Sequence, residues 1–203
     1  MSRYYDFFCP VRLMAGEQAL EQLPDELMAL GARRPLLLTD KGVGGSGLAT
    51  LLANMLAEGG LPVAAIWDEI PADSSTAVVE RIATHWRELG CDSLVALGGG
   101  SVIDTAKAVN ILVTLGGERL LDHAGAGCLT RPLKPLAAVP TTAGTGSEVT
   151  LVAVIRDEGS GRKVPFTSPF LLPQLAVLDP RLTRGLPLPI TAATAMDAMT
   201  HAI

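Results

Sequence analysis

The chain has 203 residues, of which 48% are hydrophobic and 18% charged, and its formal net charge is −5. This length suits one full domain and part of a second, and the acidic balance argues against nucleic acid as a main partner. No apolar run approaches the ~18 residues of a membrane helix, the first residues lack a signal-peptide pattern, and three unclustered cysteines favour reduced thiols in the cytoplasm.

The first half of the chain alternates short apolar runs with helical patterns. The apolar runs predict strands over residues 11–14, 35–40, 63–67 and 94–97. Apolar residues at helical spacing predict helices over residues 20–30, 48–56 and 78–89. Pro24 is expected to break or restart the first of these helices. The glycine-rich segment 40–47 is predicted to be a loop.

The second half of the chain begins with a helix predicted from Ser101, which would be its N-cap, while Asp104 would be the acidic half of a capping box. Further strands are expected over residues 136–139, 149–155 and 175–178, the second of them in a hairpin with 162–164. A last helix, capped by Thr191, would run to the end. Strands alternating with helices predict an α/β fold, with a Rossmann-like parallel sheet covered by helices on both faces.

A turn of three glycines follows the predicted strand 94–97. Gly98, Gly99 and Gly100 let a backbone approach a ligand closely, and Ser101 begins a helix whose first N–H groups have no partner within the helix. Glycines and a helix N-terminus together form a phosphate site. An ordinary strand-to-helix turn is the alternative.

Two other segments are expected at the same edge of the sheet. Asp40 ends a predicted strand and could accept a hydrogen bond from a ribose, which would favour NAD over NADP; alternatively it only begins a turn. It precedes Gly98 by 58 residues, so this is not the usual dinucleotide fingerprint. The segment 140–148 carries Thr141, Thr142 and Thr145, hydroxyl donors that could contact phosphate or ribose, although its composition also fits a generic loop.

The last predicted helix carries Asp197 and His201 at a spacing of four residues, so both lie on one face of an otherwise apolar helix. They could form an intrahelical pair, or they could bind Fe²⁺, Zn²⁺ or Mn²⁺ through oxygen and nitrogen. Spacing favours structural roles for His85 and His123.

Three separate segments resemble those of the iron-containing (group III) alcohol dehydrogenases. They are Gly-Gly-Gly-Ser-Val-Ile-Asp-Thr-Ala-Lys at 98–107, Pro-Thr-Thr-Ala-Gly-Thr-Gly-Ser-Glu at 140–148 and Ala-Thr-Ala-Met-Asp-Ala-Met-Thr-His-Ala at 193–202. Their order and spacing match as well, and the similarity extends from about Pro10 to the last residue.

The resemblance implies roles for individual residues. It implies a ribose contact for Asp40, a diphosphate turn for Gly98, Gly99, Gly100 and Ser101, contacts near the adenine and the nicotinamide for Thr141, Thr142 and Thr145, a ribose contact for Lys163, a place in the cleft wall for Leu182, and metal ligation for Asp197 and His201. Two departures put contacts in doubt: Ala72 and Leu151-Val152 stand where relatives often have asparagine.

The implied activity is the interconversion of small alcohols with aldehydes or ketones by hydride transfer, with NAD and iron (or zinc) as cofactors. Residues 1–185 would form the dinucleotide-binding domain, and 186–203 a linker and the first helix of an all-helical metal-binding domain. Because the sequence ends inside that helix, with two of the family's ligands, weak NAD and metal binding and little turnover are expected. Alternatives are a non-catalytic NAD-binding or interaction module and a zinc-dependent glycerol-dehydrogenase-like or dehydroquinate-synthase-like relative. A homodimer through the nucleotide domain is left open.

Overall fold

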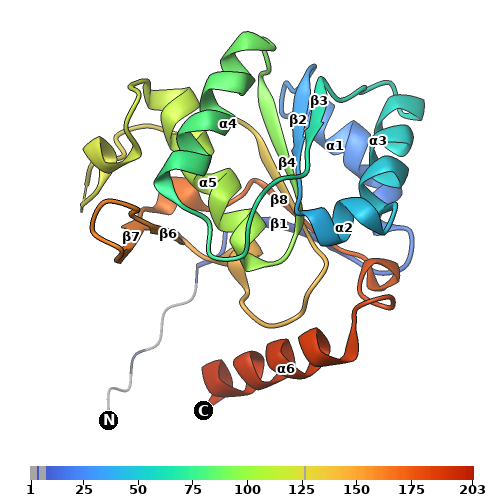
Figure 1. Ribbon diagram of the computed structural model, residues 1–203. Helices are drawn as coiled ribbons and strands as arrows, with labels where there is room; N and C mark the ends of the chain where they lie inside the picture. The colour runs from blue at the N-terminus through green and yellow to red at the C-terminus, as the bar shows by residue number, and fades with distance from the viewer. Residues whose placement is uncertain (1–3, 5–7, 126) are drawn as a thin grey trace.

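The computed structural model describes residues 4, 8–125 and 127–203 (Figure 1). Its centre is a parallel sheet of six strands in the order β1-β8-β5-β4-β2-β3. These strands are β1 (Arg12–Ala15), β2 (Pro35–Leu38), β3 (Ala65–Trp67), β4 (Ser93–Gly98), β5 (Leu136–Pro140) and β8 (Leu175–Leu178). Two further strands, β6 (Val152–Arg156) and β7 (Lys163–Thr167), form a separate antiparallel hairpin.

Helices cover both faces of the sheet, so the predicted fold is confirmed (Figure 1). The helices are α1 (Leu23–Ala29), α2 (Lys41–Gly45), α3 (Leu48–Glu58), α4 (Thr76–Glu88), α5 (Gly100–Leu115) and α6 (Leu188–Ala202). Short 3₁₀ turns are η1 (Ala19–Gln22), η2 (Leu120–His123), η3 (Ser147–Val149), η4 (Pro169–Leu171) and η5 (Pro180–Leu182). Pro24 lies in the first turn of α1, where its missing N–H costs nothing, and the chain restarts there as a helix.

The core has two halves because side chains alternate across each strand. Leu36 and Leu38 of β2 belong to the half that packs on α4 and α5, whereas Leu37 belongs to the half that packs on α1 and α3. Both faces of the central strands are therefore apolar, which explains why they are continuous hydrophobic runs in the sequence.

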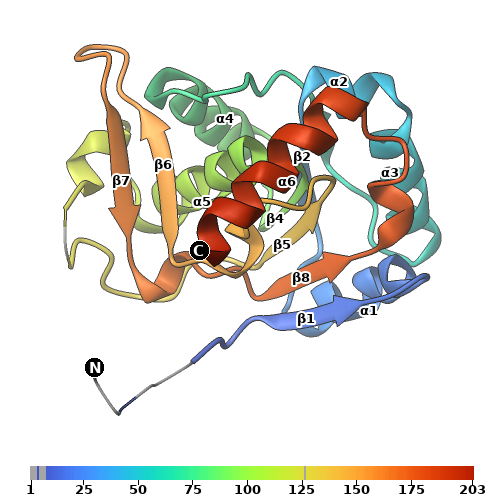
Figure 2. The same cartoon turned by 90° about the horizontal axis from the view of Figure 1, so that it is seen from below.

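The hairpin lies beside α5 (Figure 2). Ile155 of β6 and Phe166 of β7 are buried in the same half of the core as α5. The strand expected over 149–155 starts later, at Val152, because residues 147–149 form the turn η3. The strands β6 and β7 thus hydrogen-bond to each other and pack on α5. They do not join the parallel sheet, in which β8 lies between β1 and β5.

Three expectations about helix starts were wrong. The segment after Asp40 is not a loop: the Asp40 side chain caps the short helix α2 by accepting the N–H of Val43 at 2.9 Å. The N-cap of helix α5 is Gly99, two residues before the predicted Ser101, so Ser101 lies inside the first turn. The Asp104 carboxylate forms no capping box, because it accepts the N–H of Val154 at 3.0 Å.

The last helix also begins earlier than predicted. α6 starts at Leu188, and its N-cap is Pro187, whereas Thr191 lies inside it and donates to the carbonyl of Pro187. None of its residues is buried, and it runs across the end of the sheet, seen from below in Figure 2. Among the described residues, no helix combines the length and the apolar character that crossing a membrane requires.

Candidate functional site

A cleft of about 920 Å³ opens at the carboxyl ends of β2, β4 and β5. Ligands in open parallel α/β sheets bind at this edge. Most of the predicted cofactor residues line it: Asp40, Gly99, Gly100, Ser101, Thr141, Thr142, Thr145 and Leu182. Gly98 and Lys163 are not among the described lining residues. Gly98 is buried as the last residue of β4, paired with Pro140, and Lys163 lies on the hairpin.

The glycine turn is packed so tightly that side chains are excluded at two of its positions. A Cβ atom on Gly98 would lie 2.6 Å from Cγ2 of Val102, and one on Gly100 would lie 2.8 Å from Cγ2 of Thr145. The N–H groups of Val102 and Ile103 both donate to the carbonyl of Gly99, which closes the first turn of α5. The preceding amides belong to the helix N-terminus that borders the cleft, an arrangement that favours anions.

The threonine-rich segment after β5 packs directly against the glycine turn and continues the cleft wall. Thr141 is buried and donates its N–H to the carbonyl of Gly98 at 3.0 Å, and Thr145 Oγ1 accepts the N–H of Ser147 at 3.2 Å. A Cβ atom on Gly144 would lie 2.7 Å from the carbonyl oxygen of Thr194. This wall therefore touches α5 on one side and α6 on the other.

Asp40 lies at the other end of the cleft, at the start of α2. Its Oδ1 is used for the helix cap, and a carboxylate has further acceptor sites for a ligand hydroxyl. Beside it, the loop after β3 is bound to the end of β2 through the N–H of Ile70, which donates to the carbonyl of Thr39, and it contributes Ile70, Pro71 and Ala72 to the lining. The sequence analysis named Ala72 as a position where relatives make a contact, and it missed Ile70 and Pro71, although a loop that directly follows a parallel strand must emerge at the same edge.

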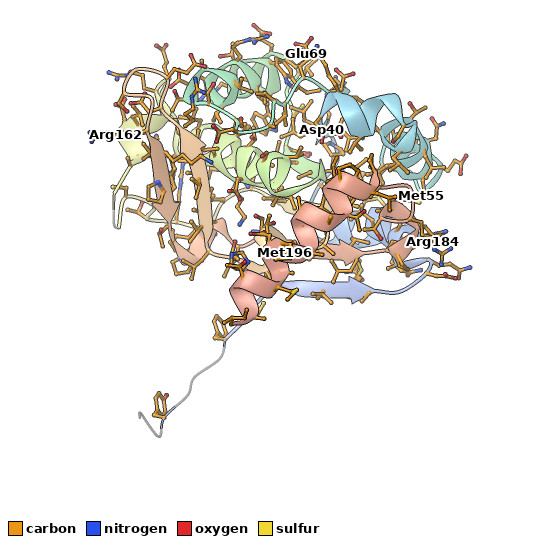
Figure 3. All side chains as sticks on the ribbon, turned by 60° about the horizontal axis from the view of Figure 1, so that its bottom comes forward. Asp40, Met55, Glu69, Arg162, Arg184 and Met196 are labelled. Atoms are coloured by element: carbon orange, nitrogen blue, oxygen red, sulfur yellow. The ribbon has the colours of Figure 1, made fainter. Side chains whose placement is uncertain are left out.

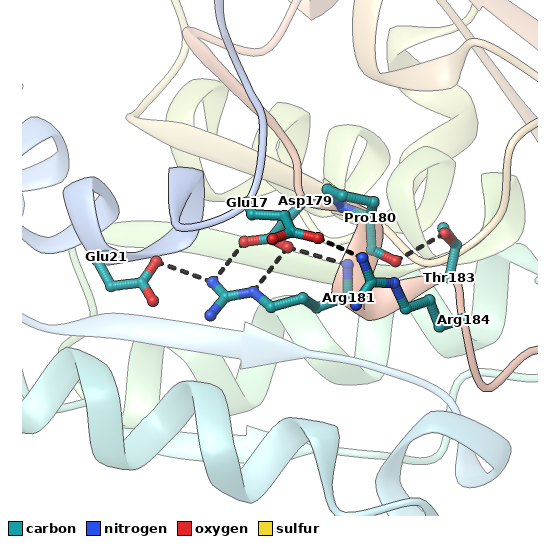
Figure 4. A network of polar contacts seen from close by, with 7 residues as sticks. All are labelled: Glu17, Glu21, Asp179, Pro180, Arg181, Thr183 and Arg184. Carbon is teal, nitrogen blue, oxygen red and sulfur yellow. Dashed lines mark hydrogen bonds and ion pairs between the residues drawn. The ribbon is translucent and has the colours of Figure 1, made fainter.

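Arg181 is another lining residue that the sequence prediction missed. Its guanidinium donates to Oδ1 of Asp179 at 2.9 Å, to Oδ2 of Asp179 at 2.6 Å and to Glu21 at 2.9 Å (Figure 4). The hydrogen bond from Arg181 holds the pKa of Asp179 below its ordinary value, against the opposing effect of burial. The network joins η5, which carries Leu182, to η1 on the far side of β8.

We expect Arg181→Gln to lower the free energy of unfolding by about 1–2 kcal/mol at neutral pH, because the buried Asp179 carboxylate loses its main partners. The loss should shrink as the pH falls below the ordinary Asp pKa of 3.8, since protonation of Asp179 removes the charge that Arg181 stabilises. Urea unfolding at neutral and acidic pH measures both effects. Arg184→Gln is the control, because Arg184 pairs with the exposed Glu17; an equal loss in this control would contradict the prediction.

A buried lysine lies behind the glycine turn, on the face of α5 that meets the hairpin. Lys107 is fully buried, and its ammonium donates to the carbonyls of Thr150 at 2.7 Å and Val152 at 2.9 Å. Burial lowers its pKa to about 8, with Asp104 and Glu148 opposing the shift. Burial also raises the pKa of Asp104. These contacts fix the segment that follows the threonine wall onto the helix that begins at the glycine turn.

The two predicted metal ligands lie further along α6. Thr194 lines the cleft, and Asp197 and His201 follow it at spacings of three and four residues, so the three share one helix face. The distance from Asp197 Oδ1 to His201 Nε2 is 4.0 Å, and both side chains are exposed, as is Met196 nearby (Figure 3). Across the described part of the chain, no three His, Cys, Asp or Glu residues gather into a metal site.

Comparison with known proteins decides the family. A family model, iron-containing alcohol dehydrogenase, matches residues 10–180. The chain belongs to the iron-containing alcohol dehydrogenase family. This confirms the resemblance seen in the three motifs, and the family is one of oxidoreductases.

Individual members of the iron-containing alcohol dehydrogenase family agree. The chain is 49% identical over 189 residues to 4-hydroxybutyrate dehydrogenase of Cupriavidus necator, covering 91% of this chain and 48% of that protein. It is 38% identical over 198 residues to NAD-dependent methanol dehydrogenase of Bacillus methanolicus, covering 98% and 51%. The chain therefore spans about half the length of the curated relatives that it matches.

Solved structures of relatives show the same architecture. A crystal structure of 1,3-propanediol oxidoreductase matches with a TM-score of 0.92 at 36% identity, covering 98% of this chain and 52% of that one. Sulfoacetaldehyde reductase from Bifidobacterium kashiwanohense, solved in complex with NAD⁺, matches with a TM-score of 0.88 at 31% identity, covering 99% and 53%.

Proposed function

We propose that this chain carries the NAD site of an enzyme that interconverts small alcohols with aldehydes or ketones by hydride transfer. The observation that carries the proposal is the glycine turn, whose main chain and helix N-terminus border the large cleft beside Asp40. The relatives support it: one is named an NAD-dependent methanol dehydrogenase, and another was solved with NAD⁺. The nicotinamide ring supplies the hydride chemistry when NAD is bound.

Different residues of the cleft would bind different parts of the cofactor. The diphosphate would rest on the amides of Gly99, Gly100 and Ser101, where the helix dipole favours negative charge. The carboxylate of Asp40 would accept a hydrogen bond from the adenosine ribose. Thr141, Thr142 and Thr145 would offer hydroxyl donors on the wall beside the glycine turn, and Leu182 would give an apolar contact. Gly98 would act indirectly, by letting α5 start close to β4.

Asp197 and His201 are proposed as metal ligands of the family's type. A carboxylate oxygen and an imidazole nitrogen suit Fe²⁺ or Zn²⁺, and a metal bound there would polarise the substrate oxygen. However, these two donors do not complete a metal site among the described residues, because a site of this kind uses at least three protein ligands. The proposal therefore gives these two residues a role in ligation alone.

The absence of buried residues in α6 supports a division of the chain near residue 186. Residues 1–185 would form the dinucleotide-binding domain, whose core is complete without the last helix. Residues 186–203 would then begin a second unit.

The role of Asp40 gives a test that does not need turnover. We expect Asp40→Asn to weaken NAD binding about tenfold, because a charged acceptor for the ribose is lost. NADP binding should tighten, because a carboxylate repels a 2′-phosphate. Asparagine is also a good N-cap, so α2 should survive the change. Titration calorimetry with both cofactors measures the two affinities.

Asp68→Asn is the matched control for this experiment. It removes the same charge at the same edge of the sheet, from an exposed residue that is not among the described lining residues. An unchanged preference for NAD in Asp40→Asn, or an equal change in the control, would contradict the proposal for Asp40. NADH absorbance with a panel of primary alcohols and polyols would test the reaction. Turnover with any of these alcohols would exclude a non-catalytic nucleotide-binding module.

A further inference from the structure

The threonine wall, residues 141–145, is packed between two helices. Toward α5, a Cβ atom on Gly99 would lie 3.2 Å from Oγ1 of Thr142. Toward α6, a Cβ atom on Gly144 would lie 2.7 Å from the carbonyl oxygen of Thr194 and 3.1 Å from its Cα. Cβ atoms in proteins essentially never come within 3.0 Å of another residue, so the main chain of α6 can come this close only because residue 144 has no side chain.

The backbone conformation of Gly144 does not itself require glycine. Its φ is not positive, whereas that of Gly146 is 64°, so alanine at position 144 would escape the strain of the left-handed region. Gly144 is also not among the described lining residues of the cleft, although Thr142 and Thr145 are. The missing side chain therefore matters for the face of the wall that meets α6.

Helix α6 depends on contacts outside itself. None of its 15 residues is buried, and no side chain caps its start. The hydroxyls of Thr191, Thr194 and Thr200 donate to carbonyl groups within the segment 187–196, so these bonds do not tie the helix to the sheet that it crosses (Figure 2). An isolated helix of this length is marginal in water. The close contact at Gly144 gives α6 a seat on the rest of the chain.

We propose that Gly144 is a positioning residue that seats α6, and with it Asp197 and His201, against the threonine wall. Asp197 follows Thr194 by three residues, which is about 4.5 Å along the helix axis. The contact of Thr194 with Gly144 thus sets where both side chains stand relative to the wall. What the wall binds, a cofactor, rests on the proposed function, whereas the contact itself does not.

The test is hydrogen exchange of the 203-residue chain, read by mass spectrometry of its peptides. Gly144→Ala should speed the exchange of the α6 amides about tenfold or more. The wall is held by its packing on α5, so α6 must move away from the added methyl group. Peptides of β4 and β5 should exchange as in the parent, and the melting temperature should change by less than about 2 °C, because no residue of α6 belongs to the core.

Saturating NAD separates positioning from the stability of the helix alone. Ile190 and Thr194 line the cleft, so NAD should slow exchange in α6 of the parent about threefold or more. In Gly144→Ala this slowing should fall below about 1.5-fold. Titration calorimetry should still show NAD affinity within about fivefold of the parent, since the residues that line the cleft are unchanged.

Gly185→Ala is the matched control. It adds the same methyl group to the segment that leads into α6, where nothing lies within 4 Å of a Cβ atom. Exchange in α6 of this variant should stay within about twofold of the parent.

The outcomes distinguish this inference from the proposed function. The inference is overturned by unchanged α6 exchange in Gly144→Ala, by equal acceleration in the control or in the β4 and β5 peptides, or by α6 amides that already exchange in the parent as fast as in an unfolded peptide. A parent chain that does not bind NAD would overturn the proposed function, while exchange measured without NAD would still decide whether Gly144 seats α6.

Discussion

Replacing Gly100 by valine should lower the affinity for NAD by more than about thirtyfold. A Cβ atom at this position would lie 2.8 Å from Cγ2 and 3.0 Å from Oγ1 of Thr145, so the threonine wall must move. The added methyl groups would also cover the amides on which the diphosphate is proposed to rest. Titration calorimetry with NAD measures the loss.

A control for this change is Gly45→Ala. Gly45 lies in α2 near the cleft, and nothing lies within 4 Å of a Cβ atom there. This variant should bind NAD like the parent. Circular dichroism of Gly100→Val should stay close to that of the parent, because the clash is with a side chain at the edge of a cleft. NAD affinity within about threefold of the parent would contradict a diphosphate site at this turn.

Replacing Lys107 by methionine should lower the free energy of unfolding by about 3 kcal/mol. The change removes the donors to the carbonyls of Thr150 and Val152 and leaves the Asp104 carboxylate without a nearby cation. Adding Asp104→Asn should recover part of the loss, because the buried charge is then gone. Urea unfolding measures both variants.

The same lysine should leave a signature in the pH dependence of stability. Its pKa is about 8 in the folded chain, against an ordinary value of 10.5. Above pH 8 the unfolded chain keeps a proton that the folded chain has released, so the free energy of unfolding should rise until about pH 10.5. Burial raises the pKa of the Cys91 thiol to about 11 from 9.0, which has the opposite effect above pH 9.

The rise between about pH 8 and pH 9 therefore belongs to Lys107, and it should be absent in Lys107→Met. Lys41→Met is the control, since Lys41 is exposed, and it should change stability by less than about 0.5 kcal/mol. A Lys107→Met variant as stable as the parent would show that the buried ammonium contributes nothing to holding the hairpin on α5.

The parallel sheet could be predicted because its strands are apolar on both faces. Leu36, Leu37 and Leu38 are all fully buried, so they form one run in the sequence. The helix α2 could not be predicted in the same way. Its five residues include three glycines, which are poor helix formers, and it exists because Asp40 caps it at the edge of the sheet.

The site shows the same division. The glycine turn and the threonine segment are continuous motifs, and both lie where the strand ends were expected. Arg181, Ile70 and Pro71 reach the cleft only through the topology, and none of them carries a local signal. Lys163 was assigned from resemblance alone, and its ion pair with Asp73 depends on a loop contact between residues 90 positions apart in the sequence.

Helix α6 lies over the mouth of the cleft without sharing the interior of the molecule. Ile190 and Thr194 of this helix line the cleft, yet none of its residues is buried. Access to the cleft and the integrity of the sheet are consequently governed by different parts of the chain. Substitutions on the exposed face of this helix can alter how a ligand enters or leaves the cleft while the melting temperature of the sheet domain stays the same. The sequence of α6 can therefore vary without loss of the fold.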